Sequence, residues 1–150
     1  MAEWITPIYD RTQADVDFAI SKIAEWRGKG VGDEYELKGC FNVSDINRIE
    51  NNIKFLSDNL SALYYFSQTS TKTWDRSGLP DIDEVTRIIS NINTIILSFY
   101  QNESAPELPE TMLTYEQINN IEENLHFLKD MLDNMVSLFR ECGTFTCGEE

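Results

Sequence analysis

Two residues of this 150-residue chain have the types and spacing of a metal-binding unit. Glu123 and His126 form a Glu-x-x-His element, which helical di-iron proteins use as ligands. Such a site does not follow here, because His126 is the only histidine and both side chains fall on the helix face that points away from a bundle core. No nucleophile motif accompanies His126 either, so a histidine-based hydrolase is not indicated. We expect a solvated, charged face at this position.

The glycines and cysteines do not indicate a ligand-binding or catalytic site either. Residues 28–32 read Gly-Lys-Gly-Val-Gly, but they follow a helical pattern and match no phosphate-binding spacing, so a flexible connector is expected. Cys142 and Cys147 would need two more soft ligands to bind zinc, and nothing in the sequence spacing favours Cys40 and His126 as those two ligands. A disulfide between Cys142 and Cys147, formed after release from the cell, stays open as an alternative. We expect no catalytic residue, no metal, no cofactor and therefore no enzyme.

Composition narrows the range of partners. The formal net charge of −14 opposes direct binding to nucleic acid or to an anionic membrane. The densest apolar run, Ile88 to Tyr100, is interrupted by polar residues and is too short to span a bilayer, and no secretory signal is recognisable. Residues 1–75 carry −4 and residues 76–150 carry −10. This acidic half either maintains solubility or offers a face to a basic partner.

Hydrophobic periodicity predicts two long amphipathic helices. The first stripe is Ile46, Ile49, Ile53, Leu56, Leu60 and Leu63, and the second is Ile118, Ile121, Leu125, Leu128, Leu132, Met135 and Phe139. At an offset of 72 residues, 46–60 and 118–132 agree at nine of fifteen positions, which predicts an internal repeat. The agreeing pairs are Ile46/Ile118, Asn47/Asn119, Ile49/Ile121, Glu50/Glu122, Asn52/Asn124, Phe55/Phe127, Leu56/Leu128, Asp58/Asp130 and Leu60/Leu132.

A shorter helical pattern precedes each long helix. Val16, Ile20 and Ile23 form the first, and residues 85–99 form the second. The expected helix caps are Thr12 with Asp15, Ser44 with Asn47, Asp81 with Glu84 and Thr114 with Gln117. We therefore predict a single all-α domain over 1–150, a four-helix bundle built from two tandem αα-hairpins. The repeat units are about 5–67 and 80–141.

Two phenylalanines fall outside the buried stripe. Phe55 and Phe127 occupy the same heptad position, roughly 130° from the centre of the seam. Either a loop or the apolar N-terminal arm, which includes Trp4 and Ile8, covers them, or they form a contact surface for another protein. Trp4, Ile8, Phe55 and Phe127 are thus the candidate interface.

Four asparagines recur beside the seam, at matching positions of the two long helices. They are Asn47, Asn52, Asn119 and Asn124. An amide at such a position can bond to a neighbouring helix or loop and fix the register of packing. The other interpretation is that they are surface residues which a duplicated segment has merely inherited.

Two stretches resemble a known protein family. Residues 4–16 contain Trp-x-x-Pro and Asp-Arg-Thr, and residues 37–52 contain Lys-Gly, Asn-x-Ser-Asp and Asn-Arg-Ile-Glu-x-Asn. This motif pair resembles small tail-region virion proteins of tailed phages and prophages of Gram-positive bacteria. The second half keeps only the helix, with Asn-Asn-Ile-Glu-Glu-Asn at 119–124.

The resemblance implies a non-enzymatic structural component of the tail, baseplate or fibre-attachment region. Such a protein is made in the host cytoplasm, resides in the virion and packs against other virion proteins and copies of itself as a homo-oligomer. The alternative function is a small acidic inhibitor, or DNA mimic, that binds a host nucleic-acid enzyme through one continuous acidic face.

Overall fold

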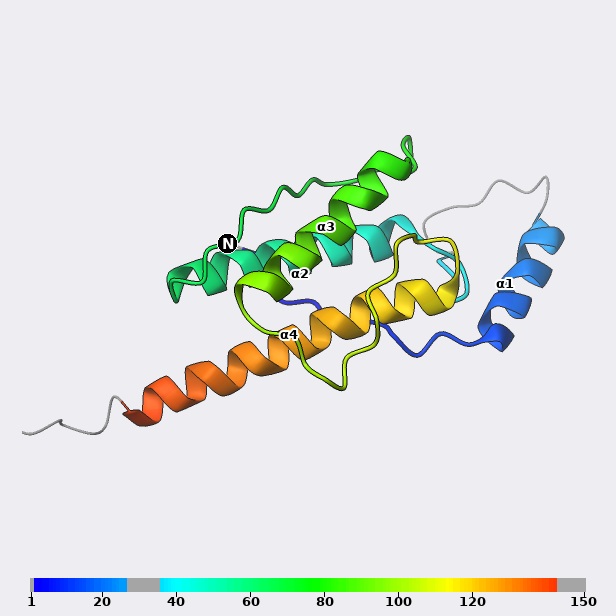
Figure 1. Ribbon diagram of the computed structural model, residues 1–150. Coiled ribbons are helices and arrows are strands. Elements are labelled where there is room, and N and C mark those ends of the chain that lie inside the picture. The colour runs from blue at the N-terminus through cyan, green and yellow to red at the C-terminus, as the bar shows by residue number, and fades with distance from the viewer. Residues whose placement is uncertain (1, 27–35, 143–150) are drawn as a thin grey trace, which may run out of the picture.

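The structure is a computed structural model that describes residues 2–26 and 36–142, without the side chains of 140–142 (Figure 1). Within these ranges the chain is all-α and contains no strand. The helices are α1 (Gln13–Trp26), α2 (Val43–Ala62), α3 (Ile82–Ser98) and α4 (Tyr115–Cys142). None of them has the length and apolar content that crossing a lipid bilayer requires.

Local side-chain bonds explain where the helices begin. Three expected caps are formed: Thr12 with Asp15, Asp81 with Glu84, and Thr114 with Gln117. The expected cap at Ser44 is wrong, because α2 begins two residues earlier. There the Asp45 carboxylate accepts a 2.8 Å hydrogen bond from the backbone N–H of Asn42. The Ser44 hydroxyl instead donates to Glu36.

The hydrophobic core lies between α2, α3 and α4. Both predicted stripes are buried up to Leu60 in α2 and Leu132 in α4, and α3 adds its own stripe between them. The fully buried large apolar side chains are Ile49, Ile53, Leu56, Leu60, Ile88, Ile92, Ile95, Ile121 and Leu125. The two long helices therefore face one another through the residues that the periodicity selected.

The three core helices run in the same direction, which contradicts the predicted αα-hairpins (Figure 1). Glu50 in the first half of α2 pairs with Arg87 near the start of α3, and Tyr65 just after α2 packs on Phe99 at the end of α3. Hairpin helices are antiparallel and joined by short loops. Here residues 63–81 and 99–114 are long enough to return along a helix of about 30 Å before the next one starts.

The first helix lies outside this core, contrary to the prediction that its stripe completes the bundle. Ala19 is buried, but Ile20 and Ile23 are 60% and 47% exposed. Figure 1 shows α1 at one end of the molecule, beyond the start of α4. The N-terminal arm, residues 2–11, already lies along α2 and α4 and leads the chain away from the core before α1 begins.

Candidate functional site

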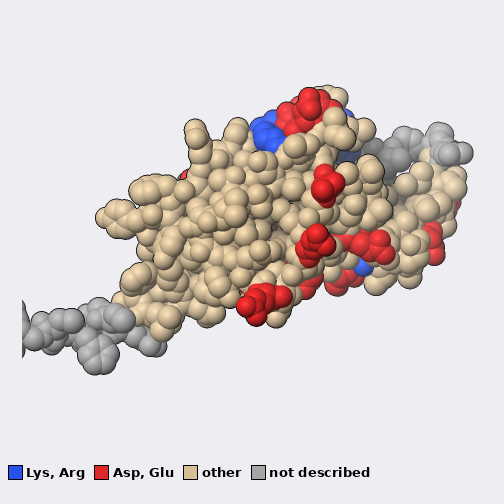
Figure 2. All heavy atoms as spheres, viewed as in Figure 1, with Lys and Arg blue, Asp and Glu red and all other residues tan. Residues whose placement is uncertain are grey.

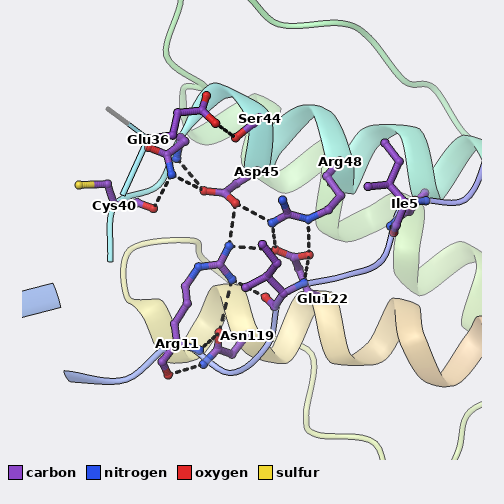
Figure 3. Close-up of polar contacts among 12 residues, drawn as sticks. Ile5, Arg11, Glu36, Cys40, Ser44, Asp45, Arg48, Asn119 and Glu122 are labelled. Atoms are coloured by element: carbon purple, nitrogen blue, oxygen red, sulfur yellow. Dashed lines mark hydrogen bonds and ion pairs between the residues drawn. The ribbon is translucent and has the colours of Figure 1, made fainter. Parts of the chain in front are cut away.

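Four buried charged side chains meet between the N-terminal arm, α2 and α4. They are Arg11, Asp45, Arg48 and Glu122, called here the ionic cluster (Figure 3). Arg11 Nη2 lies 2.8 Å from Asp45 Oδ1 and 3.1 Å from Glu122 Oε1. Arg48 donates to Asp45 Oδ1 at 2.6 Å and, through Nε, to Glu122 Oε2 at 2.8 Å. The cluster thus joins three segments that are far apart in the sequence.

The ionic cluster is electrically balanced, which makes its burial tolerable. Two guanidinium groups face two carboxylates, and Glu122 is fully buried. Burial alone lowers the pKa of Arg48, but hydrogen bonds and attraction to Glu122 and Asp45 outweigh it and raise the pKa above the ordinary arginine value. Arg48 is therefore charged at every physiological pH. The cluster attaches the N-terminal arm to α2 and α4 through paired buried charges.

Two asparagines hold the backbone of the arm. Asn52 accepts from the N–H of Ile5 at 3.0 Å and donates to its carbonyl at 2.7 Å. Asn119 likewise accepts from the N–H of Arg11 at 3.3 Å and donates to its carbonyl at 2.9 Å. Between these two points the N–H of Ile8 donates to Glu122 Oε2 at 2.8 Å. Together with the Arg11–Asp45 pair, these bonds attach the arm to both α2 and α4.

The other two asparagines of the predicted set bind the connecting segments. Asn47 accepts from the N–H of Trp74 at 2.7 Å and donates to its carbonyl at 2.9 Å. Asn124 donates to the carbonyl of Pro106 at 2.9 Å. Asn91 on α3, outside the predicted set, accepts from the N–H of Ser70 and donates to its carbonyl. These amides satisfy backbone groups that have no partner in a helix or sheet.

A third buried carboxylate ties α3 to α2. Glu50 is 2% exposed and accepts from Trp74 Nε1 at 3.1 Å and from the guanidinium of Arg87. The hydrogen bond to Glu50 raises the pKa of Arg87 and outweighs the opposing effect of burial. Lys72 lies 3.9 Å from the centre of the Trp74 ring, a favourable cation–π contact. Trp74 is therefore fixed from its backbone, its ring face and its ring nitrogen.

The candidate interface residues split into two local groups. The Trp4 ring lies 5.6 Å from that of Phe55, so the arm covers Phe55, and both side chains are only partly exposed. Ile8 is partly buried, and its carbonyl accepts from Arg11. Phe127 is also partly buried and borders a small cavity with Tyr100 and other residues that follow α3. Each phenylalanine thus has an intramolecular neighbour.

The residues considered for metal chemistry are dispersed. His126 Nε2 lies 3.2 Å from Asp130 Oδ2, and its ring stacks on Tyr9 with centroids 5.2 Å apart. No three His, Cys, Asp or Glu side chains in the described part of the chain are placed to bind one metal ion. Burial raises the pKa of the Cys40 thiol, and Asp45 adds to the effect. Residues 28–32, Cys147 and the side chain of Cys142 lie outside what the structure describes.

Toward the far end of the three core helices exposed apolar side chains gather, and the charged residues Arg140 and Glu141 follow only in the last turn of α4. Residues 59–71, 88–102 and 134–139 contain no Asp, Glu, Lys or Arg. The parallel direction of the helices brings the C-terminal parts of α2, α3 and α4 within these runs to one end, whereas Ser70 lies back beside Arg87. We call it the uncharged end, and in Figure 2 the visible face on that side is almost entirely tan, with few charged side chains. Its exposed members are Tyr64, Tyr65, Phe66, Leu97, Tyr100, Leu138 and Phe139.

One residue of the uncharged end has a strained backbone. Tyr64 follows α2 with φ of 68°, in the left-handed region that normally favours glycine. The N–H groups of Tyr64 and Tyr65 bond back to the carbonyls of Ser61 and Leu60, which closes a Schellman turn. Tyr64 is nonetheless 84% exposed. A large aromatic side chain is thus displayed to solvent where glycine would relieve strain.

Sequence reasoning identified the asparagines but missed the ionic cluster and the uncharged end. One signal for the cluster was present: Glu50 and Glu122 recur at one heptad position beside the seam. One signal for the uncharged end was the length of the three runs without charge in a chain that is 25% charged. Comparisons of the chain with protein family models, curated proteins and solved structures give no match.

Proposed function

We propose that this chain is a non-enzymatic structural protein of the tail, baseplate or fibre-attachment region of a phage virion, and that it works by protein–protein packing. The uncharged end is the observation that carries this proposal. Tyr64 and Phe66 are 84% and 71% exposed there, although the molecule already has a complete apolar core. Contiguous exposed apolar side chains of this size are typical of surfaces that bind other proteins.

The contacts between the two motif stretches that carry the family resemblance support the proposal. Trp4 and Arg11 belong to the first stretch, and Asp45, Arg48 and Asn52 belong to the second. In the structure the first stretch is bound by the second through the ionic cluster and through Asn52. The motifs therefore describe how the arm is attached, and they leave the outer surfaces free to differ between proteins.

We also infer that the two halves are repeats at an offset of 72. The contacts of matching residues support this inference. Asn47 and Asn119 each hold both main-chain groups of one residue in a passing segment. Glu50 and Glu122 each accept from an arginine on a neighbouring helix. Shared ancestry of α2 and α4 explains why the same side chains perform the same task.

The alternative, an acidic inhibitor of a nucleic-acid enzyme, requires one continuous acidic face. Figure 2 shows the exposed Asp and Glu side chains of the visible face in separate groups with uncharged residues between them. The visible face therefore does not present the continuous acidic surface that the inhibitor requires. Salt-dependent binding of the purified chain to a basic nucleic-acid enzyme, without other virion proteins, would instead support the inhibitor.

The test of the proposed function is the protein composition of purified phage particles. After induction of the host that carries the gene, particles are purified through a density gradient and analysed by mass spectrometry. The proposal expects peptides of this chain at a fixed ratio to the known tail proteins. Particles that contain tail proteins but none of these peptides would refute the structural role.

A further inference from the structure

The last turns of α4 extend beyond the helices that cover the rest of its apolar stripe. Leu132 is 3% exposed and belongs to the core, and Met135 is partly buried. Phe139, the next member of the stripe, is 57% exposed, and the adjacent Leu138 is 61% exposed. Helix α2 ends at Ala62, and Figure 1 shows α4 continuing past it. We call the exposed residues 137–139 the α4 overhang.

The charge distribution indicates what can cover the overhang. Two copies of a chain with a net charge of −14 repel one another over most of their surfaces. At the uncharged end the described side chains bring no carboxylate into such an approach, and the charge of Glu141 in the last turn of α4 is offset by that of the neighbouring Arg140. A strongly basic partner would be drawn to the acidic surfaces instead, since charge complementarity directs such encounters. The chemistry of this end thus fits another uncharged, aromatic surface.

The exposed apolar area is sufficient for a stable contact. Tyr64, Phe66 and Phe139 are 84%, 71% and 57% exposed, and an aromatic side chain can bury about 150–250 Å². When all seven exposed members of the uncharged end face one partner, they offer on the order of 800 Å², which is the area that each partner of a standard interface contributes. The strained backbone of Tyr64 is consistent with a side chain that is positioned for contact.

We propose that the uncharged end binds the same end of a second copy, so that two chains form a symmetric dimer with their α4 overhangs side by side. In such an isologous contact each residue meets its symmetry equivalent or a near neighbour, so one substitution alters the interface twice. The inference rests on the proposed function, because both require association, but it names the partner and the surface.

The test is the mass of the full-length chain in solution, measured by light scattering after size exclusion over a hundredfold range of concentration. The wild type is expected to be a dimer that dissociates on dilution. Phe139→Asp places two carboxylates in the interface and is expected to raise the dissociation constant at least tenfold without loss of helical circular dichroism. Tyr64→Gly removes an aromatic contact and is expected to raise it as well.

Ile20→Asp is the matched control, because Ile20 is a similarly exposed apolar residue on α1, at the other end of the molecule. It is expected to leave the dimer intact. A wild type that stays monomeric at every concentration would overturn the inference, as would a dimer that Ile20→Asp disrupts and Phe139→Asp does not. Presence of a monomeric chain in virions would refute the dimer alone, whereas a dimer absent from virions would refute the proposed function alone.

Discussion

Tyr65 packs edge-on against Phe99, with ring centroids 5.2 Å apart and ring planes at 69°. One residue follows the C-terminus of α2 and the other follows that of α3, so this contact fixes the two helices in the same direction. The same direction gathers the uncharged segments of the chain at one end. The parallel arrangement is therefore what separates an acidic body from an apolar docking surface.

Glu122→Gln should destabilise the fold strongly. The substitution leaves Arg11 and Arg48 buried with Asp45 as their only carboxylate, and breaking a buried ionic group in this way costs about 3–5 kcal/mol. Urea unfolding followed by circular dichroism measures the loss. Glu123→Gln on the same helix, at a partly exposed position, should change the unfolding free energy by less than about 0.5 kcal/mol. Equal effects of the two variants would contradict a fastening role for the ionic cluster.

Asn119→Ala should release the end of the arm. The Asn119 amide holds the N–H and the carbonyl of Arg11, and no other side chain replaces both bonds. Trypsin cleaves after arginine but requires an exposed backbone, so cleavage after Arg11 should become at least several-fold faster. Mass spectrometry of timed digests follows that product. Asn134→Ala, at an exposed position of α4, serves as control and should leave the rate unchanged.

Gly39→Ala should displace α1. A Cβ at residue 39 would lie 2.0 Å from the carbonyl oxygen of Asp15, and the obstacle is backbone that cannot move aside independently. We expect a loss of about 1–3 kcal/mol in unfolding free energy. Gly78→Ala makes the same chemical change where no atom lies within 4 Å and should be neutral or slightly stabilising. If both variants unfold at the same urea concentration, the close packing of Gly39 on α1 is not real.

Tyr64→Gly should stabilise the single chain while it weakens association. Glycine adopts a φ of 68° without the steric cost that a tyrosine bears, so the monomer should gain about 0.5–1 kcal/mol. Thermal unfolding at a concentration where the chain is monomeric measures this gain. Loss of stability in that experiment would mean that the Tyr64 ring supports the fold, and would remove the strain argument.

Acidification should weaken the cap at the start of α1, and the effect should be confined to pH values well below neutral. Hydrogen bonds from the backbone and hydroxyl of Thr12 lower the pKa of Asp15 below its ordinary value of 3.8. A lowered pKa in the folded chain means that the contribution is complete above pH 3.8 and is lost as the pH falls through the folded value. The difference in melting temperature between the wild type and Asp15→Asn should therefore be present at pH 7 and disappear once the pH has fallen below the lowered pKa of Asp15. Asp17→Asn, with the same change of charge on α1, controls for net charge.

The helices and their buried faces could be predicted from sequence, but their directions could not. A stripe such as Ile46 to Leu60 predicts which face of a helix is buried. The same stripe is compatible with a parallel or an antiparallel neighbouring helix. The length of the connecting segments contained the missing information, since residues 63–81 far exceed what a hairpin needs. The α1 stripe was misleading for a related reason: periodicity shows that a face is apolar without showing what covers it.

The ionic cluster could not be predicted from the sequence, because the pairing of its charges depends on which distant residues the fold brings together. Arg11 and Glu122 are 111 residues apart, and a charged side chain is expected at the surface unless its partners are known. The asparagines were easier, because a short amide beside an apolar seam has few uses other than bonding to a neighbouring backbone. The repeat at positions 47 and 119 drew attention to them.

The most direct test of the docking surface is cross-linking through single cysteines. In a chain whose three native cysteines are replaced by serine, Ser137→Cys labels the α4 overhang and Ser21→Cys labels α1, both at exposed positions. A short bismaleimide should convert the Ser137→Cys chain into a covalent dimer and leave the Ser21→Cys chain single. Efficient dimer formation through residue 21, with none through residue 137, would contradict the account.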